Sequence, residues 1–138
     1  MTGRPSPAGL RALHAARLAE KAQTHFYRAL AALAEEVPDE ATAERLNGLL
    51  ADEQHHFSRL SARLLELGES LPDSATPVDV PTLTDWEENA RARERAEISR
   101  YEQLLEVELD ARTRSIVSGF LDVERQHAAA LGGKYMGA

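Results

Sequence analysis

Proline and glycine divide this chain into four long stretches in which apolar residues recur at helical spacing. Each stretch is long enough for one helix, and they cover residues 10–36, about 40–67, 86–109 and 111–131. Ala, Leu, Glu and Arg dominate the composition while β-branched and aromatic residues are sparse, which favours helix over strand. The sequence therefore predicts an all-α fold.

The lengths of the connections predict how the helices are arranged. The first and third links are short, and short links join antiparallel neighbours. The second connection, residues 69–82, contains three prolines and is long enough to cross a bundle. We expect a ferritin-like antiparallel four-helix bundle of two hairpins over residues 10–131, with a flexible arm at 1–9 and a short tail at 132–138.

Charge and composition exclude several classes of function. The 138 residues carry a net charge of −7, which would repel a nucleic-acid backbone and attract metal cations. The chain has no cysteine, so disulfides, thiolate metal sites and cysteine nucleophiles are excluded. It also lacks an apolar run of the roughly 18–20 residues that span a bilayer, and residues 1–9 do not contain the apolar stretch expected of a signal peptide. A cytoplasmic protein without nucleic-acid or membrane partners is expected.

The two halves of the chain repeat one pattern of polar residues. The members of the two sets are Glu20, Tyr27, Glu53 and His56 in the first half, and Glu94, Tyr101, Glu124 and His127 in the second. The offset is 74 residues for the Glu/Tyr pairs and 71 for the Glu/His pairs. A tighter turn near Asp110 would absorb this difference and keep the two sets level in the bundle.

These polar residues fall on the faces that should form the core. Residues at i and i+3 share a helix face, so each Glu-x-x-His directs both side chains the same way. Apolar residues flank them at helical spacing, as Leu49 and Leu60 flank Glu53 and His56. Burying one unpaired carboxylate costs several kcal/mol, so several together require either protonation or cations. Two divalent ions would nearly balance the charge, and this ligand set suits iron or manganese better than zinc.

Chance is a poor explanation for the repeated motif. Random placement of the glutamates and histidines gives about 0.6 Glu-x-x-His matches, so a single match is weak. Two matches on core faces, each in the second helix of a hairpin, are much harder to obtain by accident. The alternative is a metal-free bundle that carries Glu/His pairs on its surface.

The motifs resemble those of the rubrerythrin branch of the ferritin-like superfamily over residues 10–131. The 33-residue spacing from Glu20 to Glu53 also occurs in bacterioferritin-like chains. The resemblance implies two terminal ligands, two bridging ligands, one imidazole for each metal, and two tyrosines that hydrogen-bond to ligand carboxylates. By this resemblance, the terminal ligands would be Glu20 and Glu94, and the bridging ligands Glu53 and Glu124. The imidazoles would come from His56 and His127, and the tyrosines would be Tyr27 and Tyr101.

Two roles are considered for Glu97. Rubrerythrins carry an additional glutamate three residues after the first ligand of the third helix, and Glu97 stands there, so the resemblance implies a ligand. The alternative is a surface glutamate paired with Arg93 or Arg100. The resemblance places Glu97, Tyr27 and Tyr101 in the catalytic machinery.

The resemblance implies a di-iron oxidoreductase that reduces hydrogen peroxide or reacts with O2. Its expected cofactors are two iron ions, with manganese or mixed metals as alternatives. Rubrerythrins append a rubredoxin domain with four cysteines; this chain has none, so an external electron-donor protein is expected, together with a homodimer. A ferritin-like ferroxidase that handles iron is the second hypothesis, although a closed shell usually needs a longer chain. A metal-free helical interaction module is the third.

Overall fold

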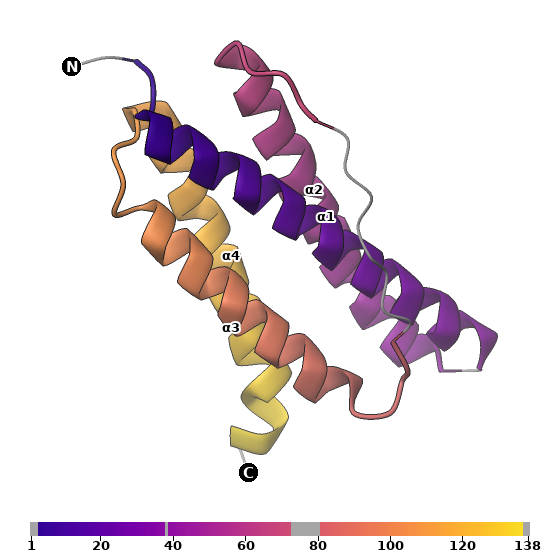
Figure 1. Cartoon of the computed structure of the whole chain (residues 1–138). Helices are drawn as coiled ribbons and strands as arrows, with labels where there is room; N and C mark the ends of the chain where they lie inside the picture. Colours follow the sequence, from indigo (N-terminus) through magenta and orange to yellow (C-terminus); the bar gives the residue numbers. More distant parts are fainter. Residues whose placement is uncertain (1–2, 38, 73–80, 137–138) are drawn as a thin grey trace.

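The computed structural model describes residues 3–37, 39–72 and 81–136, and the side chains of these residues up to Leu131. Its helices are α1 (Pro7–Glu36), α2 (Glu40–Glu66), α3 (Trp86–Leu104) and α4 (Ala111–Met136) (Figure 1). Within these ranges the chain forms helices and turns and contains no strand. The predicted all-α fold is confirmed.

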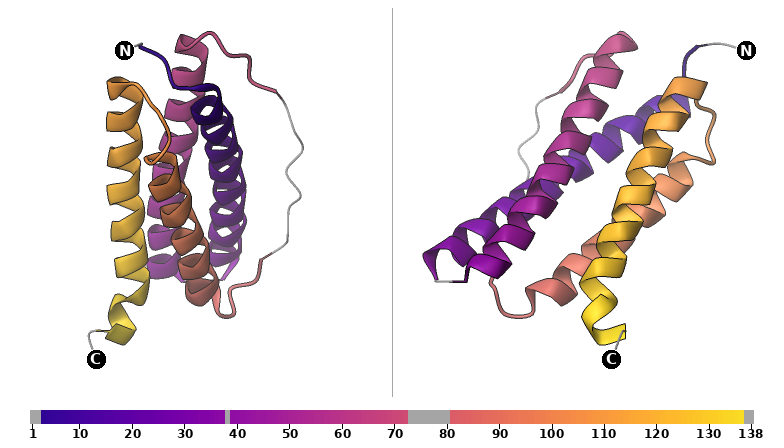
Figure 2. Two further views of the ribbon diagram at one scale, coloured as in Figure 1. Left: turned by 60° about the vertical axis from the view of Figure 1, so that its left-hand side comes forward. Right: turned by 180° about the vertical axis from the view of Figure 1, so that it is seen from behind.

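The helices form a four-helix bundle of two hairpins. Helix α2 runs antiparallel to α1, and α4 runs antiparallel to α3 (Figures 1 and 2). Because α3 begins at the end of the bundle opposite to where α2 finishes, α2 and α3 point in the same direction. The hairpins meet through α1 with α3 and α2 with α4. Most of the predicted crossover, residues 73–80, lies outside the described residues.

The first helix begins earlier than predicted. Ser6 caps α1, its hydroxyl accepting a hydrogen bond from the Gly9 backbone N–H at 3.0 Å. Pro7 then fills the first helical position, where its missing N–H costs nothing. The Ser6 backbone N–H also donates to the Glu108 carbonyl at 3.1 Å. The expected flexible arm over residues 1–9 is therefore wrong for Pro7 to Gly9, which belong to the helix.

The last helix ends later than predicted. We expected Gly132 and Gly133 to stop it, but α4 continues to Met136. A glycine stops a helix when it adopts the left-handed conformation, as Gly68 does after α2 with φ of 83°. Among the described glycines Gly68 alone has a positive φ. The predicted tail at 132–138 is therefore helical up to Met136.

The second hairpin does not have the tighter turn that was expected. Helix α3 ends at Leu104 instead of about Leu109, and a six-residue link, Leu105–Asp110, follows. The three-residue difference between the halves is thus absorbed by a shorter helix. Asp110 caps α4 as anticipated: its carboxylate accepts from the Thr113 backbone N–H at 3.1 Å and from Arg63 of α2 at 2.7 Å.

The core has two apolar clusters separated by a polar layer. One cluster includes Leu13, Leu64 and Val117, and the other includes Leu30 and Leu46. On each helix the predicted ligands lie between residues of the two clusters, so the bundle buries them at mid-length. No helix in the described part of the chain has both the length and the apolar character to cross a membrane.

Candidate metal centre

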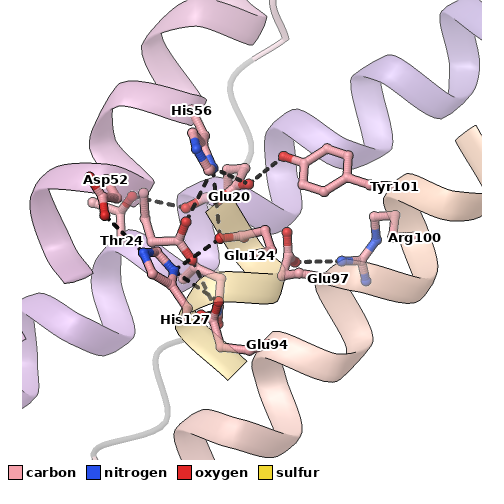
Figure 3. A network of polar contacts seen from close by, with 12 residues as sticks. Glu20, Thr24, Asp52, His56, Glu94, Glu97, Arg100, Tyr101, Glu124 and His127 are labelled. Atoms are coloured by element: carbon pink, nitrogen blue, oxygen red, sulfur yellow. Dashed lines mark hydrogen bonds and ion pairs between the residues drawn. The ribbon is translucent and has the colours of Figure 1, made fainter. Parts of the chain in front are cut away.

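Six of the seven residues predicted as metal ligands converge in the polar layer, and Figure 3 labels all of these six except Glu53. They form two overlapping groups of four, and the ligand atoms within each group all lie within 4.8 Å of one another. The groups are Glu20, Glu53, His56 and Glu124, and Glu53, Glu94, Glu124 and His127. Glu53 and Glu124 belong to both, which is the arrangement expected of bridging carboxylates. Binding of metal by these residues stays a prediction.

The convergence follows from the burial of one stripe on each helix. The four glutamates are fully buried, and the His56 and His127 residues are only 1% and 8% exposed. The His56 ring stacks on Phe120, with ring centroids 4.0 Å apart and planes inclined by 26°. Packing therefore fixes this imidazole before any ligand binds.

Each imidazole directs its Nδ1 atom at two carboxylates. His56 Nδ1 lies 3.2 Å from Glu20 Oε2 and 3.3 Å from Glu53 Oε1. His127 Nδ1 lies 3.1 Å from both Glu94 Oε1 and Glu124 Oε1. The two halves of the centre thus repeat one geometry, in which a cation could take the position between nitrogen and oxygens.

The two tyrosines bind carboxylates across the repeat. The Tyr27 hydroxyl of α1 donates to Glu94 Oε2 of α3 at 2.7 Å. In the same way, the Tyr101 hydroxyl of α3 donates to Glu20 of α1. These are the hydrogen bonds to ligand carboxylates that were expected, and both phenols are fully buried. The tyrosines therefore orient Glu20 and Glu94; their catalytic role stays a prediction.

Several buried oxygens of the centre lack a hydrogen-bond donor. Among the described residues, these atoms are Glu20 Oε1, Glu53 Oε1, Glu97 Oε2, Glu124 Oε1 and Glu124 Oε2. A buried acceptor without a partner is costly, and a carboxylate more so. Four of the five belong to the groups that share Glu53 and Glu124. A pair of oxygen-preferring cations would satisfy these atoms, so the residues present fit a di-metal centre.

Burial shifts the protonation of the bridging pair. Desolvation, with repulsion from neighbouring carboxylates, raises the pKa of Glu53 to about 9 and that of Glu124 to about 11. Burial opposes the charged form of His127, but hydrogen bonds to Glu124 and Glu94 raise its pKa to about 11. Without cations, the layer therefore holds protons that metal ions would displace.

Glu97 lies beside the centre but outside both groups of four. Its side chain is buried, and Arg100 binds one of its oxygens (Figure 3). Burial, partly offset by Arg100, raises the pKa of Glu97. The alternative interpretation, a surface glutamate paired with an arginine, is thus wrong about exposure, because Glu97 is buried, and correct about its pairing with Arg100. Ligation of a metal by Glu97 stays a prediction.

Two polar residues that contact the centre were not predicted from the sequence. Gln23 is buried, and its side-chain amide donates to Glu53 Oε2 at 3.3 Å and Glu94 Oε2 at 3.0 Å. Asp52 Oδ2 lies 2.8 Å from His127 Nε2, the ring nitrogen that points away from the ligands. A signal for Gln23 was available, because it follows Glu20 by three residues as Glu97 follows Glu94. Asp52, next to Glu53 on an exposed face, gave no signal.

A cavity of about 490 Å³ between α2 and α4 reaches the centre. Asp52 and His127 lie in its wall, together with Glu44, Arg45 and Leu49. His127 is also the most exposed of the seven predicted ligands. A small molecule or an ion could therefore approach the buried layer from this side.

Comparison of the chain with known proteins adds no relative. No protein-family model, no curated protein and no solved structure matches it.

Proposed function

We propose that this chain binds two iron ions in its polar layer and works as a rubrerythrin-like oxidoreductase that reduces hydrogen peroxide. One observation carries the proposal: buried carboxylate oxygens from all three of Glu20, Glu53 and Glu124 lack hydrogen-bond donors between two inward-facing imidazoles. Such a core is expensive unless cations complete it.

The charge balance supports two divalent ions. Five glutamates face the layer. Among the described residues, Arg100 binds Glu97, and His127, whose pKa is raised to about 11, faces Glu94 and Glu124. Two divalent ions would supply four positive charges. Carboxylate oxygens with one imidazole for each ion suit iron and manganese, whereas closed zinc sites favour nitrogen and sulfur ligands.

The bound ions would supply electrons and Lewis acidity. The chain would supply geometry: Glu53 and Glu124 hold both ions, and each remaining Glu/His pair holds one. Tyr27 and Tyr101 fix the outer carboxylates, and burial raises the pKa of Tyr101 so that its phenol keeps its proton at Oη. The apolar clusters on either side exclude bulk water, and the cavity beside His127 admits a small oxidant.

Stopped-flow oxidation of the iron-loaded, reduced protein tests this proposal. We expect hydrogen peroxide to oxidise the centre much faster than O2 does. Glu124→Gln should lose both iron binding and the reaction, whereas Glu102→Gln, an exposed glutamate paired with Arg125, should keep them. An iron-loaded protein with no preference for peroxide would contradict the peroxidase assignment.

A ferroxidase is the second candidate, and the cavity supports it. Glu44 and Asp52 place carboxylates in the wall that leads to His127, which suits the entry of Fe²⁺ as substrate. Multiple turnovers of Fe²⁺ with O2, in a particle of about 24 subunits, would favour this function. A homodimer that requires an external electron-donor protein would favour the peroxidase.

A further inference from the structure

Gln23 occupies the position in the first half of the internal repeat that Glu97 occupies in the second half. Each follows the first ligand of its helix by three residues and precedes the tyrosine by four. The flanking pairs are equivalent in space as well, because Tyr27 binds Glu94 and Tyr101 binds Glu20. The two halves of the centre therefore differ at one repeat position by an amide in place of a carboxylate.

Neighbouring groups hold the Gln23 amide in one orientation. Its oxygen accepts a hydrogen bond from Arg93 Nε at 2.6 Å, and the Arg93 guanidinium lies 4.3 Å from the centroid of the Phe26 ring. Its NH2 group consequently faces Glu53 and Glu94. Because a glutamine nitrogen donates protons, this group holds the two carboxylates without offering a metal ligand.

Glu97 has the opposite character in the other half. Its buried Oε2 has no hydrogen-bond partner. Burial, together with the neighbouring Glu97 carboxylate, raises the pKa of Glu20. Each half of the centre has one arginine at this position: Arg100 binds Glu97, and Arg93 binds Gln23. The arginines therefore do not account for a difference in charge between the two halves. Asp52 adds a carboxylate near His127, but its side chain is 54% exposed and water screens it.

We propose that the two metal positions are inequivalent and that Gln23 is the positioning residue that weakens one of them. The position between Glu20 and His56 fills first, since Glu97 adds a negative charge there. The position between Glu94 and His127 fills second, since Gln23 stands in place of that charge. This inference rests on the proposed di-metal function and adds an order of filling to it.

Titration with Co²⁺ in the absence of O2 tests the order. Crystals grown with one equivalent of Co²⁺ should show a stronger anomalous peak between Glu20 and His56 than between Glu94 and His127. Visible absorption of Co²⁺ during the titration should show two steps with affinities that differ by about tenfold or more, because the buried charge of Glu97 lies near the first ion and an amide takes its place near the second.

Two isosteric substitutions separate charge from packing. Gln23→Glu should tighten the second step by about tenfold, and Glu97→Gln should weaken the first step by a similar factor. The double variant Q23E/E97Q keeps all side-chain volumes and should reverse the order of filling. A purely structural role for Gln23 would lower both affinities without reversing the order.

The outcomes distinguish this inference from the proposed function. A wild-type protein that binds no Co²⁺ overturns the di-metal function and this inference together. Two positions that fill equally at one equivalent, or a double variant that keeps the wild-type order, overturn this inference alone. Should Gln23→Glu fail to fold, the wild-type peaks and the Glu97→Gln titration still decide the question.

Discussion

At the residue scale, the burial of Glu124 lowers the stability of the metal-free fold. Its side chain is fully buried; His127 Nδ1 lies 3.1 Å from Oε1, and Oε2 has no hydrogen-bond partner. In the metal-free protein it remains protonated, because desolvation raises its pKa to about 11. An unfolded chain would release that proton at neutral pH, so the residue destabilises the fold unless a cation binds it.

Glu124→Gln should therefore stabilise the metal-free protein while it abolishes metal binding. We expect the free energy of unfolding to rise by about 1–3 kcal/mol, because the amide needs no proton from solvent. Urea unfolding in the presence of a chelator measures the change. The control, Glu102→Gln at an exposed position, should shift it by less than about 0.5 kcal/mol. A less stable Glu124→Gln protein would contradict this account of the core.

Tyr27→Phe should lower the metal affinity of the centre without unfolding the protein. The substitution removes the hydrogen bond that orients Glu94 and leaves the apolar ring in place. Loss of such a partner typically lowers metal affinity by about 10–100-fold. Tyr101→Phe should do the same through Glu20. Metal titration of both variants checks the effect, and wild-type affinities would show that the tyrosines do not orient the ligands.

At the element scale, hydrophobic periodicity predicted the helices and the faces that carry the ligands. It also indicated Glu20, Glu53, Glu94 and Glu124, because a carboxylate within an apolar stripe is conspicuous in the sequence. Helix ends were harder to predict, since one glycine can end a helix or continue it. Gly68 adopts a positive φ after the end of α2, whereas α4 continues through Gly132 and Gly133.

Contacts that depend on tertiary structure could not be predicted from the sequence. Asp52 lies on an exposed helix face, and only the approach of α4 brings His127 within 2.8 Å of it. The early start of α1 likewise depends on a distant partner, the Glu108 carbonyl that accepts from the Ser6 backbone. Local propensity contains no information about either contact.

Two glycines in helices should respond to alanine in opposite ways. A Cβ atom on Gly9 would lie 2.7 Å from the Glu108 carbonyl oxygen, where α1 meets the α3–α4 link. Gly9→Ala should thus lower the free energy of unfolding by about 1–3 kcal/mol. Gly48→Ala in α2 meets no atom within 4 Å and should raise it by about 0.5–1 kcal/mol. Thermal and urea unfolding check both, and equal shifts would contradict the close packing at Gly9.

At the scale of the whole molecule, the bundle is built around a layer that opposes its own stability. Two apolar clusters stabilise the fold on either side, while the polar layer between them buries five glutamates and two histidines. Under the proposed function, metal binding and folding would therefore be coupled, because cations would bind the folded layer and the unfolded chain would offer no such site.

The stability of the metal-free protein should fall as the pH rises. The pKa of Glu53 is raised from 4.5 to about 9, so its protonated form favours the fold. That contribution is complete below pH 4.5 and is lost as the pH rises through about 9. The raised pKa of His127, about 11, acts in the same direction. Urea unfolding across this range with a chelator measures the slope.

Metal-saturated protein provides the control for this slope. Cations bind the ionised carboxylates and displace their protons, so its stability should rise with pH over the same range. A metal-free protein that becomes more stable between pH 4.5 and about 9 would contradict the burial of protonated carboxyl groups in the layer.

Anomalous X-ray diffraction from crystals of freshly isolated protein would locate any metal ions in the polar layer. We expect two metal ions in each chain, a few ångströms apart, with Glu53 and Glu124 bound to both and one imidazole bound to each. A fully formed bundle with no metal between these side chains, under any loading condition, would contradict the proposed di-metal centre.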